Sequence, residues 1–131
     1  MSGKVHNPPS IPKPSGYNHG FEMPGSRILF VAGQSGETTT GTVPEAFVEQ
    51  FDVALGRVMA VVKAAGGRAD NIGRLTIYVT DMDEYLATRP ALNAVYRKHL
   101  GRHYPAMSAL GVASFIQPEM KVELEATAVL E

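Results

Sequence analysis

Residues 104–112 read Tyr-Pro-Ala-Met-Ser-Ala-Leu-Gly-Val, and residues 121–130, after a short link, read Lys-Val-Glu-Leu-Glu-Ala-Thr-Ala-Val-Leu. The second run alternates between apolar and polar side chains, which is the pattern of a strand with one buried face. The apolar side chains that share one face are Val122, Leu124, Ala126 and Ala128. The polar side chains that share the other face are Glu123, Glu125 and Thr127. We therefore expect two closing strands, at about Ala106–Ala113 and Lys121–Leu130.

Upstream of these strands, the sequence predicts a long first helix. Thr42 and Glu45 have the spacing of a capping box, and Pro44 would sit in the first turn, where its missing N–H does no harm. The apolar side chains that recur at helical spacing are Phe47, Phe51, Ala54, Leu55, Val58, Val61, Val62 and Ala65. This periodicity is typical of a helix that packs on a core. Gly66-Gly67 should end the helix, because glycine adopts the left-handed cap without strain.

A strand and a second helix are expected next. Residues 73–80 alternate, with Leu75, Ile77 and Val79 on one face and polar or aromatic side chains on the other. Asp81 or Asp83 is placed to cap a helix that runs to about Leu100. Pro90 would interrupt this helix, so we expect a short helical turn and then a longer piece from about Pro90. The core-facing side chains of the second piece would be Leu92, Val95, Tyr96 and Leu100.

The amino-terminal part of the chain predicts three further strands. Residues 1–16 form a proline-punctuated arm with a short strand near Lys4–His6, and a second strand spans about His19–Met23. The run Arg27–Gly33 is almost continuously apolar, as expected of a strand that is buried on both faces. A threonine-rich loop follows at residues 36–41.

These elements give the order β-β-β-α-β-α-β-β. We therefore predict one α+β domain over residues 1–131, with a single mixed sheet of about six strands and two helices packed on one face. The other face would carry Thr76, Tyr78, Glu123 and Glu125. That face either stays in contact with water or is covered by a second subunit.

The composition excludes several classes of protein. The chain has 131 residues, no cysteine, and 12 basic against 13 acidic side chains, for a net charge of −1. Disulfides and thiolate sites are therefore excluded, and nothing indicates an electrostatic hold on nucleic acid or on a membrane. No signal peptide or apolar run of membrane-spanning length is visible, so we expect a cytoplasmic protein.

The sequence also lacks the familiar motifs for a phosphate-binding loop and for a paired-histidine metal site. The segment from Gly33 to Gly41 lacks the Lys-Ser/Thr of a phosphate-binding loop. His99 and His103 are four residues apart, but Gly101 separates them and breaks the helical geometry that a shared metal would need. We expect neither a cofactor nor a metal ion.

Short segments along the whole chain, in this order and spacing, resemble the Rid/YjgF family of small trimeric imine and enamine deaminases. The segments are Asn7-Pro8-Pro9, Gly16-Tyr17, Phe30-Val31-Ala32-Gly33-Gln34, Ala64-Ala65-Gly66-Gly67, Val79-Thr80-Asp81-Met82, Asn93-Ala94-Val95-Tyr96 and Tyr104-Pro105. The resemblance implies a homotrimer whose clefts lie between subunits and bind a small-molecule ligand. The ribonuclease activity attached to some relatives finds no support here, because the sequence shows no basic groove.

Carried over position by position, the resemblance implies a pocket formed by Tyr17, Gly33, Asn93, Met107 and Glu123. In the family's deaminases an arginine stands at the position of Met107 and grips the substrate carboxylate, and the glutamate matched by Glu123 helps to position water. This sequence also departs from the family pattern at Pro90 and by about one extra residue before Lys121.

A methionine cannot anchor an anion, and its thioether favours an apolar or aromatic ligand. Without an arginine at this position, the substrate carboxylate loses a charge-assisted hydrogen bond that contributes about 1.5–3 kcal/mol to binding. We therefore expect a substrate other than 2-aminoacrylate. Glu123 would act as the acid/base. The Gly33 N–H and Asn93 would make polar contacts with the substrate, and Tyr17 would form a wall of the pocket. Arg89, Arg102 and His103 are the cations that could replace the missing one.

Each of these residues also has a structural interpretation. Met107 could be core packing, Glu123 and Glu125 interface or surface carboxylates, Tyr17 the cover of a sheet edge, and Asn93 an exposed helix residue. Two hypotheses follow: an enzyme that hydrolyses an imine or enamine, and a binding or interaction protein that uses the same cleft without turnover.

Overall fold

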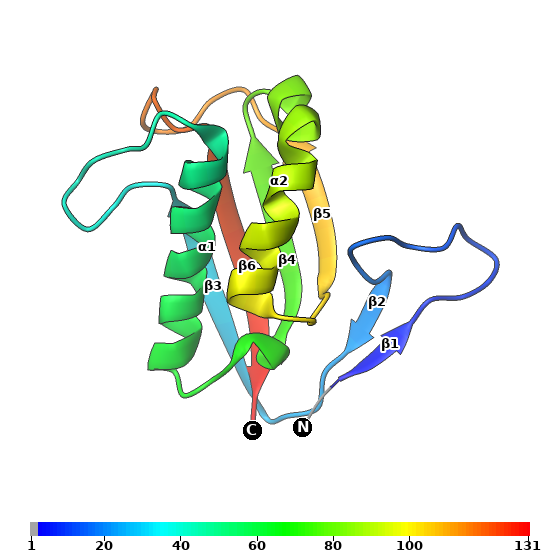
Figure 1. Cartoon of the computed structure of the whole chain (residues 1–131). Helices are drawn as coiled ribbons and strands as arrows, with labels where there is room; N and C mark the ends of the chain where they lie inside the picture. The colour runs from blue at the N-terminus through cyan, green and yellow to red at the C-terminus, as the bar shows by residue number, and fades with distance from the viewer. Residues whose placement is uncertain (1–2) are drawn as a thin grey trace.

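The structure, a computed structural model, describes residues 3–131, so the first two residues of the predicted arm lie outside it. Two helices and six strands make a mixed α+β fold in the predicted order (Figure 1). The strands are β1 (Lys4–His6), β2 (Gly20–Glu22), β3 (Arg27–Ser35), β4 (Ile72–Val79), β5 (Ala106–Gly111) and β6 (Val122–Leu130). The helices are α1 (Phe47–Ala64) and α2 (Met82–Leu100), with a 3-10 turn at Ala69–Asn71.

Four strands form the central sheet in the order β3-β6-β4-β5. β4 and β5 are parallel, whereas β6 is antiparallel to both of its neighbours. β1 and β2 pair with each other in a ribbon, which an isolated bridge between Asn18 and Ala106 links to the β5 edge. All six predicted strands are therefore present, but the first two do not join the sheet through a full ladder.

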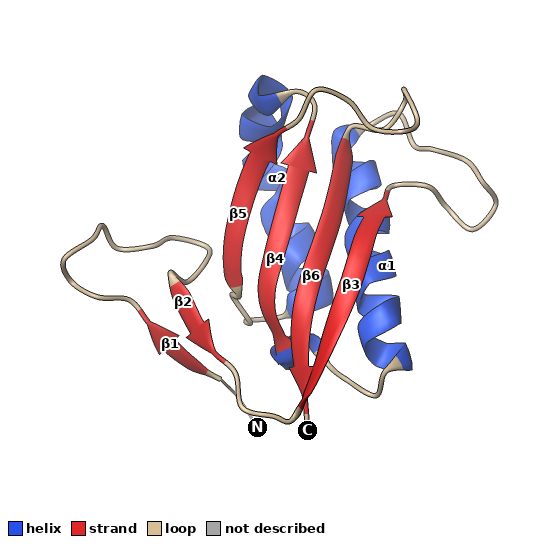
Figure 2. Cartoon of the chain, turned by 180° about the vertical axis from the view of Figure 1, so that it is seen from behind, coloured by secondary structure: helices blue, strands red, loops and turns tan. Residues whose placement is uncertain are grey.

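Both helices cover the same face of the central sheet, and the other face is bare (Figure 2). The alternation in β6 explains this arrangement: Val122, Leu124 and Ala128 are fully buried beneath the helices, and Glu123 and Glu125 point to the bare face. The apolar stripe of α1 packs on the same layer, as predicted. We call the uncovered side, which carries Ile28, Phe30, Thr76, Tyr78, Glu123, Glu125 and Thr127, the open face.

β3 is not buried on both faces, contrary to the prediction. Val31 is buried under the helices, but Ile28 is 62% exposed and Phe30 is 77% exposed on the open face. The reason is that β3 is an edge strand of a sheet with helices on one side only. Large apolar side chains on an uncovered sheet face are typical of a surface that another molecule covers.

The start of α1 also differs from the prediction of a capping box. The helix begins at Phe47 after Ala46, whose side chain makes no capping bond, and the Thr42 N–H donates to Thr38 Oγ1 at 3.2 Å within the preceding loop. At its other end, Gly66 has a φ of +84° and the Gly67 N–H donates to the Val62 carbonyl at 2.9 Å. This is the glycine termination that the sequence predicts.

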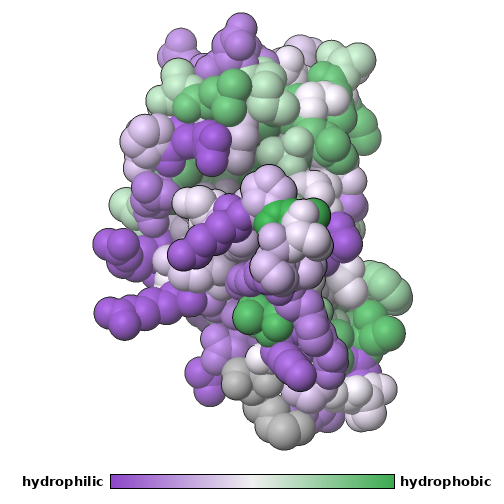
Figure 3. All heavy atoms as spheres, turned by 90° about the vertical axis from the view of Figure 1, so that its right-hand side faces the viewer, coloured by the Kyte–Doolittle hydropathy of each residue, from purple (hydrophilic) through white to green (hydrophobic). Residues whose placement is uncertain are grey.

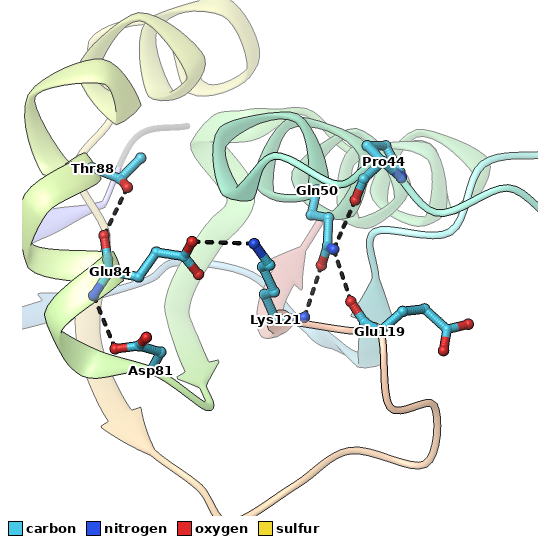
Figure 4. A network of polar contacts seen from close by, with 7 residues as sticks. All are labelled: Pro44, Gln50, Asp81, Glu84, Thr88, Glu119 and Lys121. Carbon is cyan, nitrogen blue, oxygen red and sulfur yellow. Dashed lines mark hydrogen bonds and ion pairs between the residues drawn. The ribbon is translucent and has the colours of Figure 1, made fainter.

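Gln50, in the first turn of α1, fixes the loop before the helix and the link before β6 (Figure 4). Its Nε2 donates to the carbonyls of Pro44 at 2.8 Å and Glu119 at 3.0 Å, and its Oε1 accepts from the Lys121 N–H at 2.8 Å. The side chain is 1% exposed, so all three bonds are shielded from water. Gln50 therefore holds together segments that are far apart in the sequence.

The structure overturns the predicted break at Pro90, because α2 is one continuous helix from Met82 to Leu100. Proline has a φ compatible with the helix, and it removes only the hydrogen bond that would end on Leu86, a residue that is half exposed. The prediction of the helix start is confirmed, since Asp81 Oδ1 accepts from the Glu84 N–H at 3.1 Å. The expected core contacts of this helix are also present, with Leu92, Val95 and Leu100 buried.

Candidate functional site

A cleft of about 910 Å³ lies between α2, β5 and the segment that follows the proline-rich arm. Its lining side chains from α2 include Met82, Tyr85, Arg89, Asn93, Tyr96 and Arg97. Tyr17, Tyr104, Met107 and Ile77 close it from the other side. On the side of the molecule that carries β5 and the ribbon, hydrophilic and hydrophobic side chains are interspersed (Figure 3). The cleft therefore offers both apolar walls and polar groups to a ligand.

Three of the predicted pocket residues, Tyr17, Asn93 and Met107, line this cleft. Met107 is paired with Leu75 across the β4–β5 ladder, so its side chain points to the helix-covered face of the sheet. There it is partly buried against the core. Met107 thus packs on the core and also lines the cleft.

The neighbouring residue Asn18 holds Tyr17 at the cleft. The Asn18 Nδ2 donates to the Tyr104 carbonyl at 2.6 Å, and the Asn18 N–H donates to the Pro105 carbonyl at 3.3 Å. Asn7 in turn donates to Asn18 Oδ1 at 2.8 Å. Asn18 therefore ties the arm to the start of β5 and positions the Tyr17 wall.

The other two predicted pocket residues, Gly33 and Glu123, lie together on the open face. A Cβ atom at position 33 would overlap the Glu123 carboxylate, so glycine is required while Glu123 keeps this position. Glu123 is paired with Ser35 of β3 and with Tyr78 of β4. The carboxylate thus lies on the open face near the end of the sheet where β3 and β4 finish, against the backbone of Gly33.

Glu123 and Glu125 differ in their hydrogen bonding, although they share a strand face. The Tyr78 hydroxyl donates a hydrogen bond to Glu125 Oε1, and this bond raises the pKa of Tyr78, with burial and the two carboxylates adding to the effect. No side chain among residues 3–131 donates to the Glu123 carboxylate. Glu123 is therefore the carboxylate that remains available to a water or a ligand.

Within one chain, the predicted site is divided between two faces of the sheet. Met107 is on the helix-covered face with Leu75, and Glu123 is on the open face with Tyr78. Side chains on opposite faces of a sheet cannot contact the same small molecule. Tyr17, Asn93 and Met107 therefore form one group, and Gly33 and Glu123 form another.

Of the three cations that the sequence offers as a carboxylate anchor, only Arg89 lines the cleft. Arg102 is outside it, and His103 Nε2 is 2.6 Å from the Ile72 carbonyl and its ring packs edge-on against Phe21. Sequence reasoning missed Arg97, Tyr85 and Tyr104, which also line the cleft. The signal for Arg97 was its spacing of four residues from Asn93, which places both on the same side of a helix.

Neither a metal centre nor a membrane span is found in the described part of the chain. Among residues 3–131, no group of three or more His, Asp or Glu side chains is placed to hold a metal ion. His99 instead contacts Asp52 Oδ1, with 2.6 Å between the Nε2 and the carboxylate oxygen. No helix of this part is both long enough and apolar enough to cross a bilayer.

Comparison with known proteins places these features in a family. The family model described as Endoribonuclease L-PSP matches residues 10–130. The 2-iminobutanoate/2-iminopropanoate deaminase of Escherichia coli (strain K12) is 32% identical over 90 residues, which cover 69% of this chain and 69% of that protein. A RutC family protein of Aquifex aeolicus is 33% identical over 123 residues, which cover 90% of this chain and 94% of that protein.

The fold agrees with these sequence matches. The crystal structure of YyfB from Yersinia pestis, a Rid-family protein of unknown function, aligns with a TM-score of 0.84 and 29% identity. The alignment covers 99% of this chain and 100% of that one. Since both the family model and the full-length structural match span nearly the whole sequence, the chain belongs to the Endoribonuclease L-PSP family, which is the Rid/YjgF family.

Proposed function

We propose that this protein is a homotrimer that hydrolyses an imine or enamine metabolite other than 2-aminoacrylate, in a cleft completed by a neighbouring copy. The observation that carries the proposal is the division of the site, with Met107 and Glu123 on opposite faces of the sheet. A second copy docked by its open face would bring its Gly33 and Glu123 to the cleft of the first. The deaminase activity named for the Escherichia coli relative supports the reaction class.

The open face has the surface properties that such an assembly needs. Ile28 is 62% exposed and Phe30 is 77% exposed in the single chain. Burial of apolar surface contributes about 25 cal/mol per Å², so these two side chains favour association. In closed symmetric oligomers, the same patch recurs at every interface, which gives one complete cleft for each chain.

The reaction assigns a chemical role to Glu123. Its carboxylate would take a proton from a water as that water attacks the imine carbon, and would return a proton to the nitrogen as ammonia leaves. The net change is the addition of one water to the imine, which gives a carbonyl compound and ammonia. Asn93 and the Gly33 N–H would orient the substrate, and Met107 would contact its apolar part.

Ammonia release tests the proposed reaction. Imines are generated from several amino acids by an amino-acid oxidase, and ammonia release is compared for the wild type, Glu123→Gln and the matched variant Glu125→Gln. We expect Glu123→Gln to lose at least about tenfold in rate, because it removes the acid/base group, and Glu125→Gln to lose less. Equal rates for the wild type and Glu123→Gln on every imine would contradict catalysis through Glu123.

Mixing of inactive variants tests whether the site is shared. Asn93→Ala damages the cleft group and Glu123→Gln the open-face group, so each alone should be inactive. If sites form between copies, unfolding and refolding a 1:1 mixture should restore about a quarter of the sites, those that pair two intact groups. Phe30→Lys should give a species with the 14.1 kDa mass of one chain, while Ala60→Lys on the exposed side of α1 should not.

The alternative is a protein that binds a metabolite in the same cleft without turnover. It is favoured by Met107, which stands where the family's deaminases have a basic anchor. Ligand binding that is unaffected by Glu123→Gln, together with no ammonia release above the spontaneous rate, would support this alternative.

A further inference from the structure

The cleft carries a net positive charge although the chain as a whole is slightly acidic. The formal net charge of the protein is −1. The side chains that line the cleft include Arg89 and Arg97, and no Asp, Glu, Lys or His. A cleft with two unopposed guanidinium groups attracts an anionic ligand, because no lining carboxylate competes for them.

The two arginines lie in one row along α2. The residues Tyr85, Arg89, Asn93 and Arg97 follow one another at intervals of four residues. This spacing places them on the same side of the helix, with about 6 Å between each residue and the next. Neither arginine side chain has an ion-pair partner among residues 3–131. Arg89 also acts on Tyr96: burial raises the pKa of the Tyr96 hydroxyl, Tyr85 adds to this rise, and the Arg89 charge opposes it.

Of the two cleft arginines, Arg89 lies nearer than Arg97 to the level of Met107. α2 runs antiparallel to β5 (Figure 1), and a Cβ atom on Gly111 would lie 4.0 Å from Met82 Cε, so these residues mark the same end of the cleft. Met107 is about 13 Å further along the strand. That distance corresponds to about nine helical residues, which reaches Ala91, two residues beyond Arg89. Arg97 lies about one and a half turns beyond.

The rest of the cleft suits the apolar part of a ligand. Ile77, Met82, Leu92 and Met107 supply aliphatic and thioether surface, and four tyrosines supply ring surface. The volume of about 910 Å³ is in the range of sites that hold drug-sized molecules. A three-carbon acid would leave most of this surface without a contact.

We propose that Arg89 replaces the missing basic anchor and binds the carboxylate of the substrate from α2, so that the substrate is a 2-imino acid with an aromatic or large apolar side chain. This inference rests on the proposed function and specifies its substrate class. The carboxylate would be held between Arg89 and Asn93 on the helix side of the cleft, and the side chain would lie along Met107 and the tyrosines. An anchor at position 107 would bind the substrate carboxylate from strand β5. With Arg89 as the anchor, the carboxylate would instead be bound from helix α2.

Binding of a stable analogue tests this assignment without requiring turnover. Phenylpyruvate has the shape and charge of an aromatic 2-imino acid, its amide has the shape without the charge, and pyruvate has the charge without the ring. Affinities are measured by titration calorimetry for the wild type, Arg89→Gln and the matched control Arg102→Gln, which changes an exposed arginine outside the cleft. Glutamine is as good a helix former as arginine, so the helix should persist, and melting temperatures check this.

We expect Arg89→Gln to weaken phenylpyruvate binding about 10- to 100-fold, and to leave binding of the amide unchanged. Arg102→Gln should bind both as the wild type does, and pyruvate should bind more weakly than phenylpyruvate. The assignment is refuted if Arg89→Gln binds phenylpyruvate normally, if Arg97→Gln alone causes the loss, or if pyruvate binds as tightly as phenylpyruvate. Charge-dependent binding without ammonia release would contradict the proposed enzyme activity but support Arg89 as the anchor. Ammonia release at the same rate in the wild type and Arg89→Gln would support the enzyme activity and contradict this anchor.

Discussion

Gly33 and Glu123 lie so close together on the open face that a methyl group at position 33 would overlap the Glu123 carboxylate. The contact is made between the β3 bulge and the neighbouring strand β6, at the point where the ladder register shifts after Val31. Bulges are frequent next to active sites, where they aim a side chain or expose a backbone group. Here the bulge leaves space for one carboxylate.

We predict that Gly33→Ala displaces Glu123 while the fold persists. The overlapping atoms belong to the end of a flexible side chain, which can rotate away, so the free energy of unfolding should change by less than about 1 kcal/mol. Ammonia release should fall as it does in Glu123→Gln. The double variant is the control: if both changes act through one carboxylate, it should be no slower than the slower single variant. Additive losses would show that Gly33 acts by another route.

Met107→Arg should add activity on 2-aminoacrylate. The new guanidinium would enter the cleft beside Tyr17 and Asn93 and supply the carboxylate anchor that a thioether cannot. Ammonia formed from enzymatically generated 2-aminoacrylate measures the gain, and Met107→Gln serves as a polar control without charge. If Met107→Arg gains nothing over Met107→Gln, the cleft differs from that of the family's deaminases by more than one charge.

Gln50→Leu should destabilise the fold by about 2–4 kcal/mol. The substitution removes three buried hydrogen bonds and leaves the Pro44 and Glu119 carbonyls and the Lys121 N–H without their partner. Urea unfolding measures the change, and the neighbouring exposed variant Glu49→Leu is the control. A loss below about 0.5 kcal/mol would mean that water replaces the amide at little cost.

The contribution of Asp52 to stability should depend on pH. Burial tends to raise the pKa of Asp52, but hydrogen bonds from His99 and Lys98 outweigh burial, so its pKa is lowered from 3.8. A lowered pKa stabilises the fold above the unfolded-state value and loses this contribution as the pH falls through the folded-state value. Wild type should therefore be more stable than Asp52→Asn at pH 7, by less than about 1 kcal/mol because the pair is partly exposed. The difference should disappear as the pH falls through the lowered folded-state pKa of Asp52. Thermal unfolding across this range, with Asp70→Asn as control, gives the measurement.

Much of the fold was predictable because its signals are local. The alternation of β6, the glycine end of α1 and the Asp81 cap of α2 each depend on residues adjacent in the sequence. Gln50 escaped notice because its partners, Pro44, Glu119 and Lys121, are brought together only by the fold. Pro90 was misread because a helix packed on a core tolerates the loss of one hydrogen bond at an exposed position.

The cleft was predictable only in part. Tyr17, Asn93 and Met107 were found through a resemblance, and the structure brings them to one cleft, but no periodicity in the sequence links an arm, a helix and a strand. Glu123 and Met107 are separated because the helices cover the face of the sheet that carries Met107 and leave the other face open. The sequence around either residue does not indicate which face the helices cover. Arg97 and Tyr85 needed only the helical spacing of α2, which the expected break at Pro90 had obscured.

The attachment of the arm by Asn18 has a consequence for ligand entry. Tyr17 forms part of the wall of the cleft, yet its segment is held to the start of β5 by the Asn18 bonds to Tyr104 and Pro105. We therefore expect a molecule that fills the cleft and contacts Tyr17 to stabilise the ribbon as well, and by linkage a stabilised ribbon would favour the occupied cleft to the same extent. Amide hydrogen exchange in the β1–β2 ribbon, which does not line the cleft, should consequently report occupancy of the site from outside it.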